Sequence, residues 1–343
     1  MDILIFDMDG VLIDVSRSYR ETIQRTVQIY LETCLGFERD KGRLVTEEDI
    51  SLFKSAGGFN NDWDLTSGLL LYLLSLSDIS PYAKRKRFSS IGEVVSYLKK
   101  QSSQFTQNTS RLLQKKDLSP FIREVGSAGG GLKGIHRAIG TSWDGWVYGK
   151  GDLNKENVVK RIFQEVYLGE KFASHYRLLS LFYKNHGLYL QERLLISTEI
   201  LSSLHKKVRL GIASGRPRLE AELALKRFGL LPYFDSMVTL DECEEEERQV
   251  FRSTGKKVKY SKPHPYSLLR VAQETGLPHP RCAYVGDVVD DILAAQAAKK
   301  ELQMLAIGFL RGRKKQKALK ESLLRAGADL LIESPNELLQ FIP

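Results

Sequence analysis

The stretch "ILIFDMDGVLIDVSRSYR" (Ile3–Arg20) runs four apolar residues directly into two carboxylates. The apolar run Ile3–Phe6 predicts a buried strand. Asp7 stands at the end of this run, and Asp9 follows two positions later. Carboxylates at the end of a buried strand are costly unless other groups pair with them. These two acids therefore need partners from other parts of the chain.

Five more strand-like runs lie in the second half of the chain. They are Val208–Ala213, Ser236–Leu240, Ala283–Val285, Met304–Ile307 and Asp329–Ile332. The helical patterns between most of them are Arg218–Phe228, Tyr266–Glu274 and Ile292–Lys299. This alternation predicts a Rossmann-like parallel α/β sheet with crossover helices.

A long segment without a convincing strand pattern separates the first strand from the others. Its helical patterns are Ser18–Leu35, Asp64–Leu76, Asn154–Leu168 and Lys171–Lys184. The tetrapeptide "TEED" (Thr46–Asp49) is typical of a capping box that opens another helix. We therefore predict an α/β core of residues 1–15 and 190–343, interrupted by a large all-α domain of residues 16–189.

The composition of this insert changes over residues 80–151. Ser, Gln, Lys and Gly dominate there, and the stretch "SAGGGLKG" (Ser127–Gly134) is rich in glycine. Such a composition predicts a partly ordered elaboration that contains a mobile glycine-rich loop.

The chain has 343 residues, of which 42% are hydrophobic, and this suits one large or two modest folded domains. The apolar run Leu69–Leu76 is too short to span a bilayer. The amino terminus enters a predicted strand within two residues, which leaves no room for a signal peptide. Cys34, Cys243 and Cys282 are scattered and fit a reducing compartment better than a disulfide framework. We predict a soluble cytoplasmic protein with no membrane partner.

The formal net charge of +9 could suit nucleic acid, an anionic surface or small anionic substrates. Basic runs such as Lys84–Arg87 and Arg311–Lys317 carry much of this charge. Neither run is interleaved with the aromatic residues that a platform for single-stranded nucleic acid uses. We interpret the runs as solvated faces and expect no nucleic-acid partner.

Four polar features lie at or near the carboxyl ends of the predicted strands, where open α/β sheets bind ligands. They are the pair Asp7 and Asp9, Ser214 in "LGIASGRP", Lys262 in "SKPHP" and the run "GDVVDD" (Gly286–Asp291). Each feature alone has a plainer interpretation as a turn, a helix cap or a surface charge. Their order and shared sheet edge predict a single site.

Each of these residue types has a role in phosphoryl transfer. Asp7 and Asp287 can bind Mg²⁺, because this hard ion prefers carboxylate oxygens. The metal would neutralise charge that otherwise repels Asp7 from a phosphate, so that Asp7 could attack phosphorus. Asp9 could protonate the leaving oxygen and later activate water.

The other polar residues suit binding of the phosphate. Ser214 offers a hydroxyl, Gly215 allows backbone amides to approach an anion, and Lys262 adds a positive charge. Asp290 and Asp291 could orient the waters of the metal or hold Lys262 in place.

The motifs "DMDGV", "ASG", "SKP" and "GDVVDD" resemble those of the haloacid dehalogenase superfamily of hydrolases. The resemblance covers about residues 1–15 and 190–343. It implies that Asp7 is the nucleophile, that Asp9 is the general acid and base, and that Ser214 and Lys262 bind the phosphate. It also implies that Mg²⁺ is held by Asp7, Asp287 and the backbone carbonyl of Asp9.

The inserted segment resembles the helical cap of subfamily IA, which includes phosphoglycolate phosphatase and β-phosphoglucomutase, although this insert is enlarged. The stretches "FKSAGGFNNDWDLT" and "DVSRSYR" are similar to a subgroup known mostly as hypothetical proteins, so the resemblance names no substrate. Dehalogenases of the superfamily need no magnesium and typically lack an acid at the position of Asp9. The presence of Asp9 and Asp287 favours phosphate chemistry.

Candidate substrate contacts lie mainly in the insert. They are Arg17, Tyr19, Arg20, Asn60, Asn61, Asp62 and Trp63, with Arg216 from the core. Amides beside an indole would suit a polyhydroxylated or cyclic substrate. In the plainer interpretation Tyr19 packs on the first helix, Asp62 or Asp64 opens the next helix, and Trp63 belongs to the core.

The function that these residues favour is a Mg²⁺-dependent phosphatase acting on a small-metabolite phosphomonoester through an aspartyl-phosphate. A phosphoglucomutase-like phosphotransferase would use the same core residues and is an alternative. A non-catalytic partner-binding protein on the same core is a second alternative, which the intact motif set argues against because a pure binder does not need Asp9.

Overall fold

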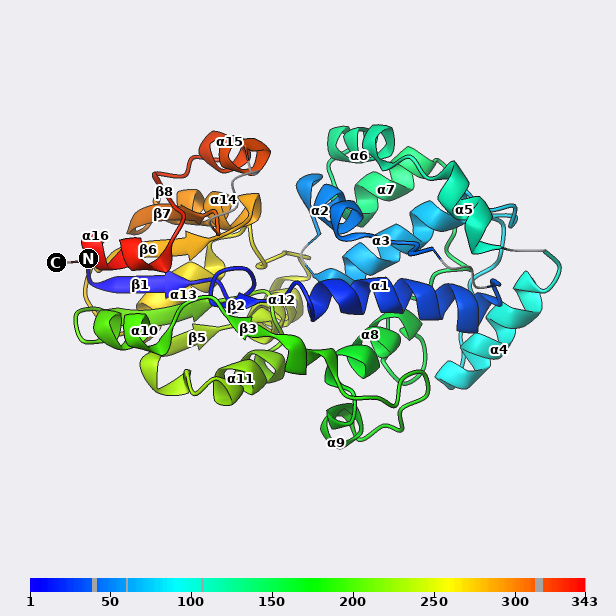
Figure 1. The fold of residues 1–343 in the computed structure, drawn as a ribbon, viewed down its shortest axis with the longest axis horizontal. Helices are drawn as coiled ribbons and strands as arrows, with labels where there is room; N and C mark the ends of the chain where they lie inside the picture. Colours follow the sequence, from blue (N-terminus) through cyan, green and yellow to red (C-terminus); the bar gives the residue numbers. More distant parts are fainter. Residues whose placement is uncertain (39–41, 60, 106–107, 312–316, 343) are drawn as a thin grey trace. The chain divides into compact units, whose positions relative to one another are not determined.

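The structure is a computed structural model, and it describes residues 1–38, 42–59, 61–105, 108–311 and 317–342. The chain divides into two compact units. The core unit comprises Met1–Val15 and Glu192–Pro343, and the inserted unit comprises Ser16–Gln191 (Figure 1).

A six-stranded parallel sheet forms the centre of the core unit. Its strands, in spatial order, are β5 (Ser236–Val238), β4 (Arg209–Ala213), β1 (Ile3–Phe6), β6 (Arg281–Gly286), β7 (Gln303–Phe309) and β8 (Leu330–Ile332). Every neighbouring pair is parallel, which confirms the predicted α/β core. Phe6 lies opposite both Ile212 and Val285, so β1, β4 and β6 end at the same edge of the sheet.

Helices cover the sheet of the core unit. They are α10 (Thr198–His205), α11 (Arg218–Arg227), α12 (Leu240–Thr254), α13 (Tyr266–Glu274), α14 (Val289–Ala298), α15 (Lys317–Arg325) and α16 (Leu338–Phe341). Ile3 and Ile5 are fully buried and share a cluster with Val271 of α13 and Ile292 of α14. Because side chains alternate along a strand, Phe6 points to the other face, where its ring packs edge-on against Phe234.

A short antiparallel pair joins β2 (Ile13–Asp14) to β3 (Arg193–Leu194), and the sequence pattern predicted neither strand. Between β1 and β2 the chain forms a tight loop in which the amides of Leu12 and Ile13 both donate to the carbonyl of Met8, at 3.0 and 2.9 Å. The core chain before the insert therefore pairs with the chain that follows it.

The inserted unit is built from helices. They are α1 (Tyr19–Ile29), which continues as a π-helix (Tyr30–Cys34), α2 (Glu47–Ser55), α3 (Asp62–Ser75), α4 (Ile91–Ser102), α5 (Thr109–Lys115), α6 (Leu118–Ser127), α7 (Gly131–Ile139), α8 (Val158–Leu168) and α9 (Lys171–Tyr176). In the described residues, the short 3₁₀ turns are Leu188–Gln191, Leu231–Tyr233 and Pro335–Glu337. Thr46 caps α2 in the capping box expected from "TEED".

Residues 80–151 contain more regular structure than their composition predicted, because α4 to α7 all lie there. These helices bury one narrow face each, and in α4 that face carries Ile91, Val94 and Leu98. The glycine-rich stretch is also not simply a loop, since α7 begins at Gly131. A Cβ on Gly134 of this helix would lie 2.6 Å from the carbonyl oxygen of Val125, so the glycine allows α6 and α7 to pack closely.

Two of the predicted helices are shorter in the structure than the sequence pattern indicated. The helix predicted over Lys171–Lys184 ends at Tyr176, because Arg177 adopts a left-handed conformation (φ 54°) that a helix cannot continue. The helix predicted from Asn154 begins only at Val158, where the side chain of Asn157 caps it.

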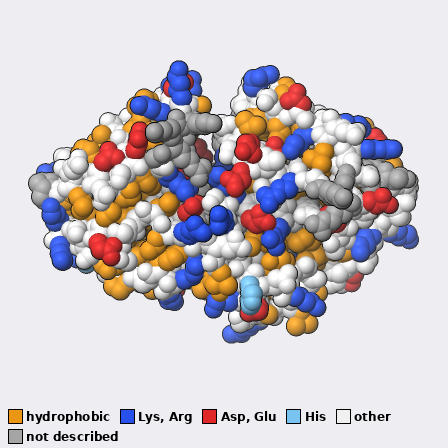
Figure 2. Space-filling model, in the orientation of Figure 1, with side chains coloured by type: hydrophobic (Ala, Val, Ile, Leu, Met, Phe, Trp, Pro, Cys, Tyr) orange, Lys and Arg blue, Asp and Glu red, His pale blue; other side chains and the backbone are white. Residues whose placement is uncertain are grey.

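Basic side chains are spread over the face of the molecule shown in Figure 2, among acidic and apolar ones, on both units. This distribution agrees with the interpretation of the +9 net charge as many solvated positions. In the described parts of the chain, no helix combines the length and the apolar character that crossing a membrane requires.

Candidate active site

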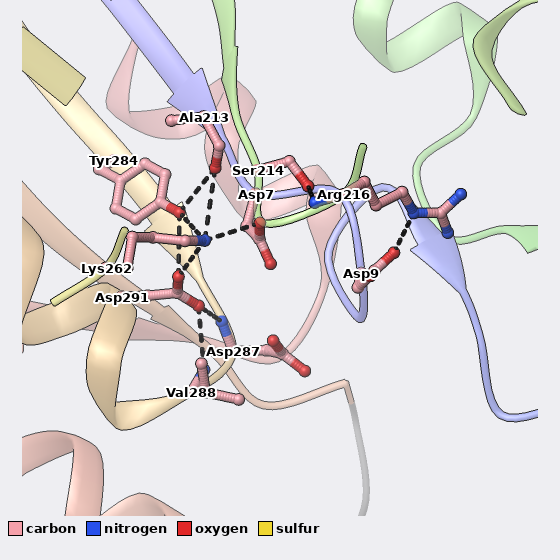
Figure 3. Close-up of polar contacts among 10 residues, drawn as sticks. All are labelled: Asp7, Asp9, Ala213, Ser214, Arg216, Lys262, Tyr284, Asp287, Val288 and Asp291. Carbon is pink, nitrogen blue, oxygen red and sulfur yellow. Dashed lines mark hydrogen bonds and ion pairs between the residues drawn. The ribbon is translucent and has the colours of Figure 1, made fainter. Parts of the chain in front are cut away.

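The carboxyl ends of β1, β4 and β6 bring together residues that are far apart in the sequence (Figure 3). Asp7 follows β1, Ser214 follows β4, and Asp287 follows β6. Lys262 reaches the same place from a turn ahead of α13, where its peptide bond to Pro263 is cis. The parallel register of the three strands is therefore the reason that these side chains meet.

Lys262 is the cation of this site. Its Nζ lies 2.8 Å from Oδ1 of Asp7, 2.6 Å from Oδ1 of Asp291 and 2.8 Å from the hydroxyl of Tyr284. Burial lowers the pKa of this ammonium, but the carboxylates of Asp291 and Asp7 outweigh burial and raise the pKa well above its ordinary value. Lys262 is therefore a fixed positive charge.

Asp291 holds the site together. Oδ1 of this fully buried residue pairs with Lys262 and accepts a hydrogen bond from the Tyr284 hydroxyl at 3.0 Å. Oδ2 accepts from the amides of Asp287 and Val288, at 3.1 and 3.2 Å, just before α14 (Val289–Ala298) begins. One carboxylate thus places both the ammonium and the backbone that carries Asp287.

Asp7 is almost completely buried, at 6% exposure, and it lies among other acids. Burial raises its pKa to about 8; the carboxylates of Asp291, Asp9 and Asp287 act in the same direction, and Lys262 opposes them. The negative charge of this cluster exceeds the single positive charge of Lys262, which favours binding of a proton or a cation.

A divalent cation fits this arrangement. Asp7, Asp287 and Asp291 each offer a carboxylate oxygen, and these oxygens lie within 4.8 Å of one another. Hard cations such as Mg²⁺ prefer oxygen ligands. Because both oxygens of Asp291 already accept hydrogen bonds, Asp7 and Asp287 are the better candidates for direct ligands.

Two positions in the motifs must be glycine, because the side chain of an aspartate lies very close to each of them. Gly10 has φ 82°, and a Cβ there would lie 2.0 Å from Oδ2 of Asp287. A Cβ on Gly286 would lie 2.2 Å from the Cβ of Asp291. Asp287 can therefore approach the loop after β1, and Asp291 the end of β6, only because a glycine stands opposite each of them.

Asp9 points away from Lys262 and toward Arg216 (Figure 3). Nε of Arg216 lies 2.5 Å from Oδ1 of Asp9, and the other two guanidinium nitrogens lie 3.0 and 3.5 Å from the carboxylate of Glu192. Arg216, which the sequence predicts as a substrate contact, thus has two acidic partners in the core unit. Its side chain is only 1% exposed, because it is buried between two acids.

Ser214 and Gly215 lie between β4 and α11. The hydroxyl of Ser214 accepts a hydrogen bond from the amide of Arg216 at 3.2 Å, and Gly215 is exposed. Helix α11 starts at Arg218, directly after Pro217. The hydroxyl and the exposed glycine thus stand just before a helix amino terminus, which is a favourable place for an anion.

Sequence reasoning missed two residues of this region. The hydroxyl of Tyr284 contacts Lys262 and Asp291, and its oxygen also lies 3.1 Å from the carbonyl oxygen of Ala213. A tyrosine inside a buried parallel strand could have indicated this, because a buried hydroxyl needs partners. Glu192 carries no comparable indication in its sequence context. Of the two acids expected to hold Lys262, Asp291 makes the ion pair, while burial raises the pKa of Asp290 to about 6.

The aromatic candidates of the inserted unit pack within that unit. Tyr19 is 4% exposed and stacks on Tyr167 of α8, with ring centroids 4.5 Å apart. Trp63 is 8% exposed, its ring lies edge-on to Phe163, and Nζ of Lys160 lies 4.3 Å from the centre of the indole. The contacts of Trp63 agree with the plainer interpretation that it belongs to the core. Tyr19 is also packed inside the unit, but it is the first residue of α1 and packs on α8 instead of on the first helix.

The polar candidates of the inserted unit have local partners too. Asn61 caps α3 by accepting a hydrogen bond from the amide of Asp64 at 2.7 Å, and Asp62 opens that helix and pairs with Lys54 at 3.2 Å. Arg20 pairs with Glu47 of α2 at 3.6 Å. The remaining two candidates differ: Arg17 is exposed, and Asn60 lies outside the described residues.

Comparisons with known proteins match parts of this chain. Residues 148–299 match the family model of haloacid dehalogenase-like hydrolases, a range that includes Ser214, Lys262 and Asp287. The chain is 30% identical over 128 residues to a phosphoglycolate phosphatase of Xanthomonas campestris pv. campestris, which covers 37% of this chain and 48% of that protein. It is also 23% identical over 297 residues to an imidazoleglycerol-phosphate dehydratase of Phytophthora nicotianae, covering 86% of this chain and 41% of that protein.

The fold has a relative among solved structures. A phosphatase from Thermococcus thioreducens superposes with a TM-score of 0.52 at 20% identity, over 94% of this chain and 99% of that one. The matches to the two curated relatives span less than half the length of each of those proteins.

Proposed function

We propose that this chain is a haloacid dehalogenase-like hydrolase, the family whose model matches residues 148–299, and that it hydrolyses a phosphomonoester through a phosphoryl group carried on Asp7. The observation that carries the proposal is the ammonium of Lys262, which lies within hydrogen-bond distance of both Asp7 and Asp291, in a cluster that also includes Asp287. A buried cation beside a buried acid suits binding of a phosphate dianion next to a nucleophile.

The first half of the reaction transfers the phosphoryl group. A carboxylate oxygen of Asp7 attacks phosphorus, and the bond between phosphorus and the ester oxygen breaks. The leaving oxygen takes a proton from the carboxyl group of Asp9 and departs as an alcohol. Lys262 and Ser214 hold the oxygens of the transferred group as negative charge spreads over them.

The second half regenerates the acids. A water molecule gives a proton to the carboxylate of Asp9, and its oxygen attacks phosphorus. The bond between phosphorus and the Asp7 oxygen breaks, which releases inorganic phosphate and returns Asp7 to its carboxylate form. In total one phosphomonoester and one water give one alcohol and one phosphate, with every proton accounted for.

We propose that Asp7, Asp287 and the backbone carbonyl of Asp9 hold Mg²⁺. When bound, this ion supplies positive charge that offsets the repulsion between the acids and the phosphate. The oxygen-only donor set of the cluster supports this choice of metal.

The proposed substrate is a small phosphorylated metabolite. The relative named phosphoglycolate phosphatase supports this class without fixing the compound. We also propose a cytoplasmic location, which is supported by three cysteines that are all buried as free thiols.

The proposal is tested by measuring phosphate release from a panel of phosphomonoesters with and without Mg²⁺. We expect kcat/KM to be sharply higher for one compound, and we expect EDTA or Asp7→Asn to abolish turnover. Inclusion of a sugar bisphosphate in the panel distinguishes hydrolysis from phosphotransfer, because a transferase would give an isomerised monophosphate instead of free phosphate. Absence of Mg²⁺-dependent release across the panel would overturn the proposal.

A further inference from the structure

We propose that Arg216 is a positioning residue for Asp9 and that Glu192 in turn fixes Arg216. The inference rests on the proposed function, because it assigns these residues a part in the proton transfers by Asp9. Arg216 is not one of the residues that surround Lys262, which are Asp7, Asp287 and Asp291 and which we call, with Lys262, the Lys262 cluster. Glu192 lies outside the four sequence motifs.

The contact to Asp9 is charge-assisted and directional. Nε of Arg216 lies 2.5 Å from Oδ1 of Asp9, while the Asp9 side chain remains 30% exposed. One oxygen of Asp9 is thus held by the guanidinium, and the carboxylate still reaches the surface of its unit. A general acid needs this combination, because it must be both oriented and accessible.

Glu192 removes the remaining freedom of Arg216. Its carboxylate is 0% exposed and takes the other two guanidinium nitrogens, so the guanidinium spans two acids. The carbonyl of Glu192 accepts a hydrogen bond from Arg227 at 3.1 Å, which also anchors its backbone. Because Glu192 balances the charge of the guanidinium, Arg216 contributes direction to Asp9 more than net charge.

The backbone of Arg216 is fixed as well. Its amide donates to the hydroxyl of Ser214, and its carbonyl accepts from the amide of Leu240 at 2.9 Å. The guanidinium therefore connects three segments of the core unit: the loop after β1, the loop after β4 and the chain just before β3. A side chain held at both ends in this way can fix the rotamer of Asp9.

The experiment compares how much each variant slows the hydrolysis of two kinds of phosphomonoester, whose leaving groups differ in their need for a proton. An alkyl phosphate needs protonation of its leaving oxygen, whereas p-nitrophenolate leaves without a proton. We expect Arg216→Met to lower kcat/KM for the best alkyl phosphate of the panel by about 100-fold or more, in the range of general acid catalysis. The rate of the first-turnover burst of p-nitrophenolate should change by less than about tenfold. Asp9→Asn serves as the reference for this pattern.

Two further variants keep the test valid if Arg216→Met does not fold. Arg216→Lys retains a cation beside Glu192 but cannot span both acids, and Glu192→Gln weakens the anchor of Arg216. Both variants should lose kcat/KM for the alkyl phosphate while keeping most of the burst rate with p-nitrophenyl phosphate. The loss should be smaller in Glu192→Gln. Stabilisation by Mg²⁺ with beryllium fluoride, which mimics a phosphoryl group on Asp7, should be retained in every variant.

Equal losses with both substrates, or no loss in any variant, would overturn the positioning role while leaving the phosphatase proposal intact. If the unmodified protein releases product from neither substrate, the proposed function itself fails. The two failures are therefore distinguishable.

Discussion

Nζ of Lys262 lies 2.8 Å from Oδ1 of Asp7, although 255 positions separate the two residues along the chain. The pair is buried, with side chains that are 14% and 8% exposed. It forms because β1 lies at the middle of the sheet and its carboxyl end faces the turn ahead of α13. The contact joins the first and third sequence motifs directly.

Substitution of Lys262 by methionine should destabilise the fold as well as abolish turnover. It would leave Asp7 and Asp291 buried without their ammonium, and the loss of one partner of a buried ion pair costs about 3–5 kcal/mol. The control is Lys299→Met, which removes a 2.7 Å pair with Asp329 whose side chains are 33% and 30% exposed. That change should cost at most about 1 kcal/mol in the free energy of unfolding. Equal losses in the free energy of unfolding of the Lys262→Met and Lys299→Met variants, measured by urea denaturation, would contradict the expectation.

The stability of the metal-free protein should fall as the pH rises. The pKa of Asp7 increases from its ordinary value of 3.8 to about 8 on folding. The native state therefore binds a proton that the unfolded state releases between these two values, so the stabilisation is complete below about pH 4 and is lost as the pH rises through about 8. In the Asp7→Asn variant residue 7 carries no titratable group, so the decrease in the free energy of unfolding that Asp7 causes should be absent. Parallel stability curves of both proteins in EDTA, between pH 5 and pH 9, would contradict the assignment.

The sheet and the Lys262 cluster were predictable because both follow from short-range patterns. Apolar runs specify buried parallel strands, and the carboxyl ends of such strands meet at one edge. The sequence alone therefore assigns Asp7, Ser214, Lys262 and Asp287 to one place.

The contacts of Arg216 could not be predicted in the same way. Whether an arginine points to a ligand or to a buried acid depends on tertiary packing, and Glu192 belongs to no recognisable pattern. The helices within residues 80–151 were missed for a related reason. Their narrow buried faces and polar surfaces resemble the composition of loops, and tertiary packing outweighs local propensity there.

Substitution of Gly10 by alanine should strain the backbone and should also lower the activity of the site. The change imposes a side chain at φ 82° and also places a Cβ 2.0 Å from Oδ2 of Asp287. The control is Gly229→Ala, at φ 67° with no atom within 4 Å of the added Cβ. In both variants the free energy of unfolding should decrease by about 1–2 kcal/mol, because alanine is strained in the left-handed conformation. Only Gly10→Ala should also displace Asp287 and lower the Mg²⁺-dependent activity. Equal activities of the two variants would show that the close approach to Asp287 is not needed.

Substitution of Asp287 by asparagine should weaken the binding of Mg²⁺ more than the same change at Asp290. Asp287 belongs to the carboxylate cluster that could hold the metal, whereas Asp290 was predicted only to support it. Loss of a supporting residue typically costs 10- to 100-fold in metal affinity, so we expect Asp287→Asn to raise the half-saturating Mg²⁺ concentration by more than about 100-fold. Asp290→Asn should change it by less than about tenfold, because Asp291 still holds Lys262 and the amide of Asp287. Activity titrated with Mg²⁺ at fixed substrate measures both values. If Asp290→Asn shifts the titration as far as Asp287→Asn does, the assignment of Asp287 but not Asp290 as a direct ligand is wrong.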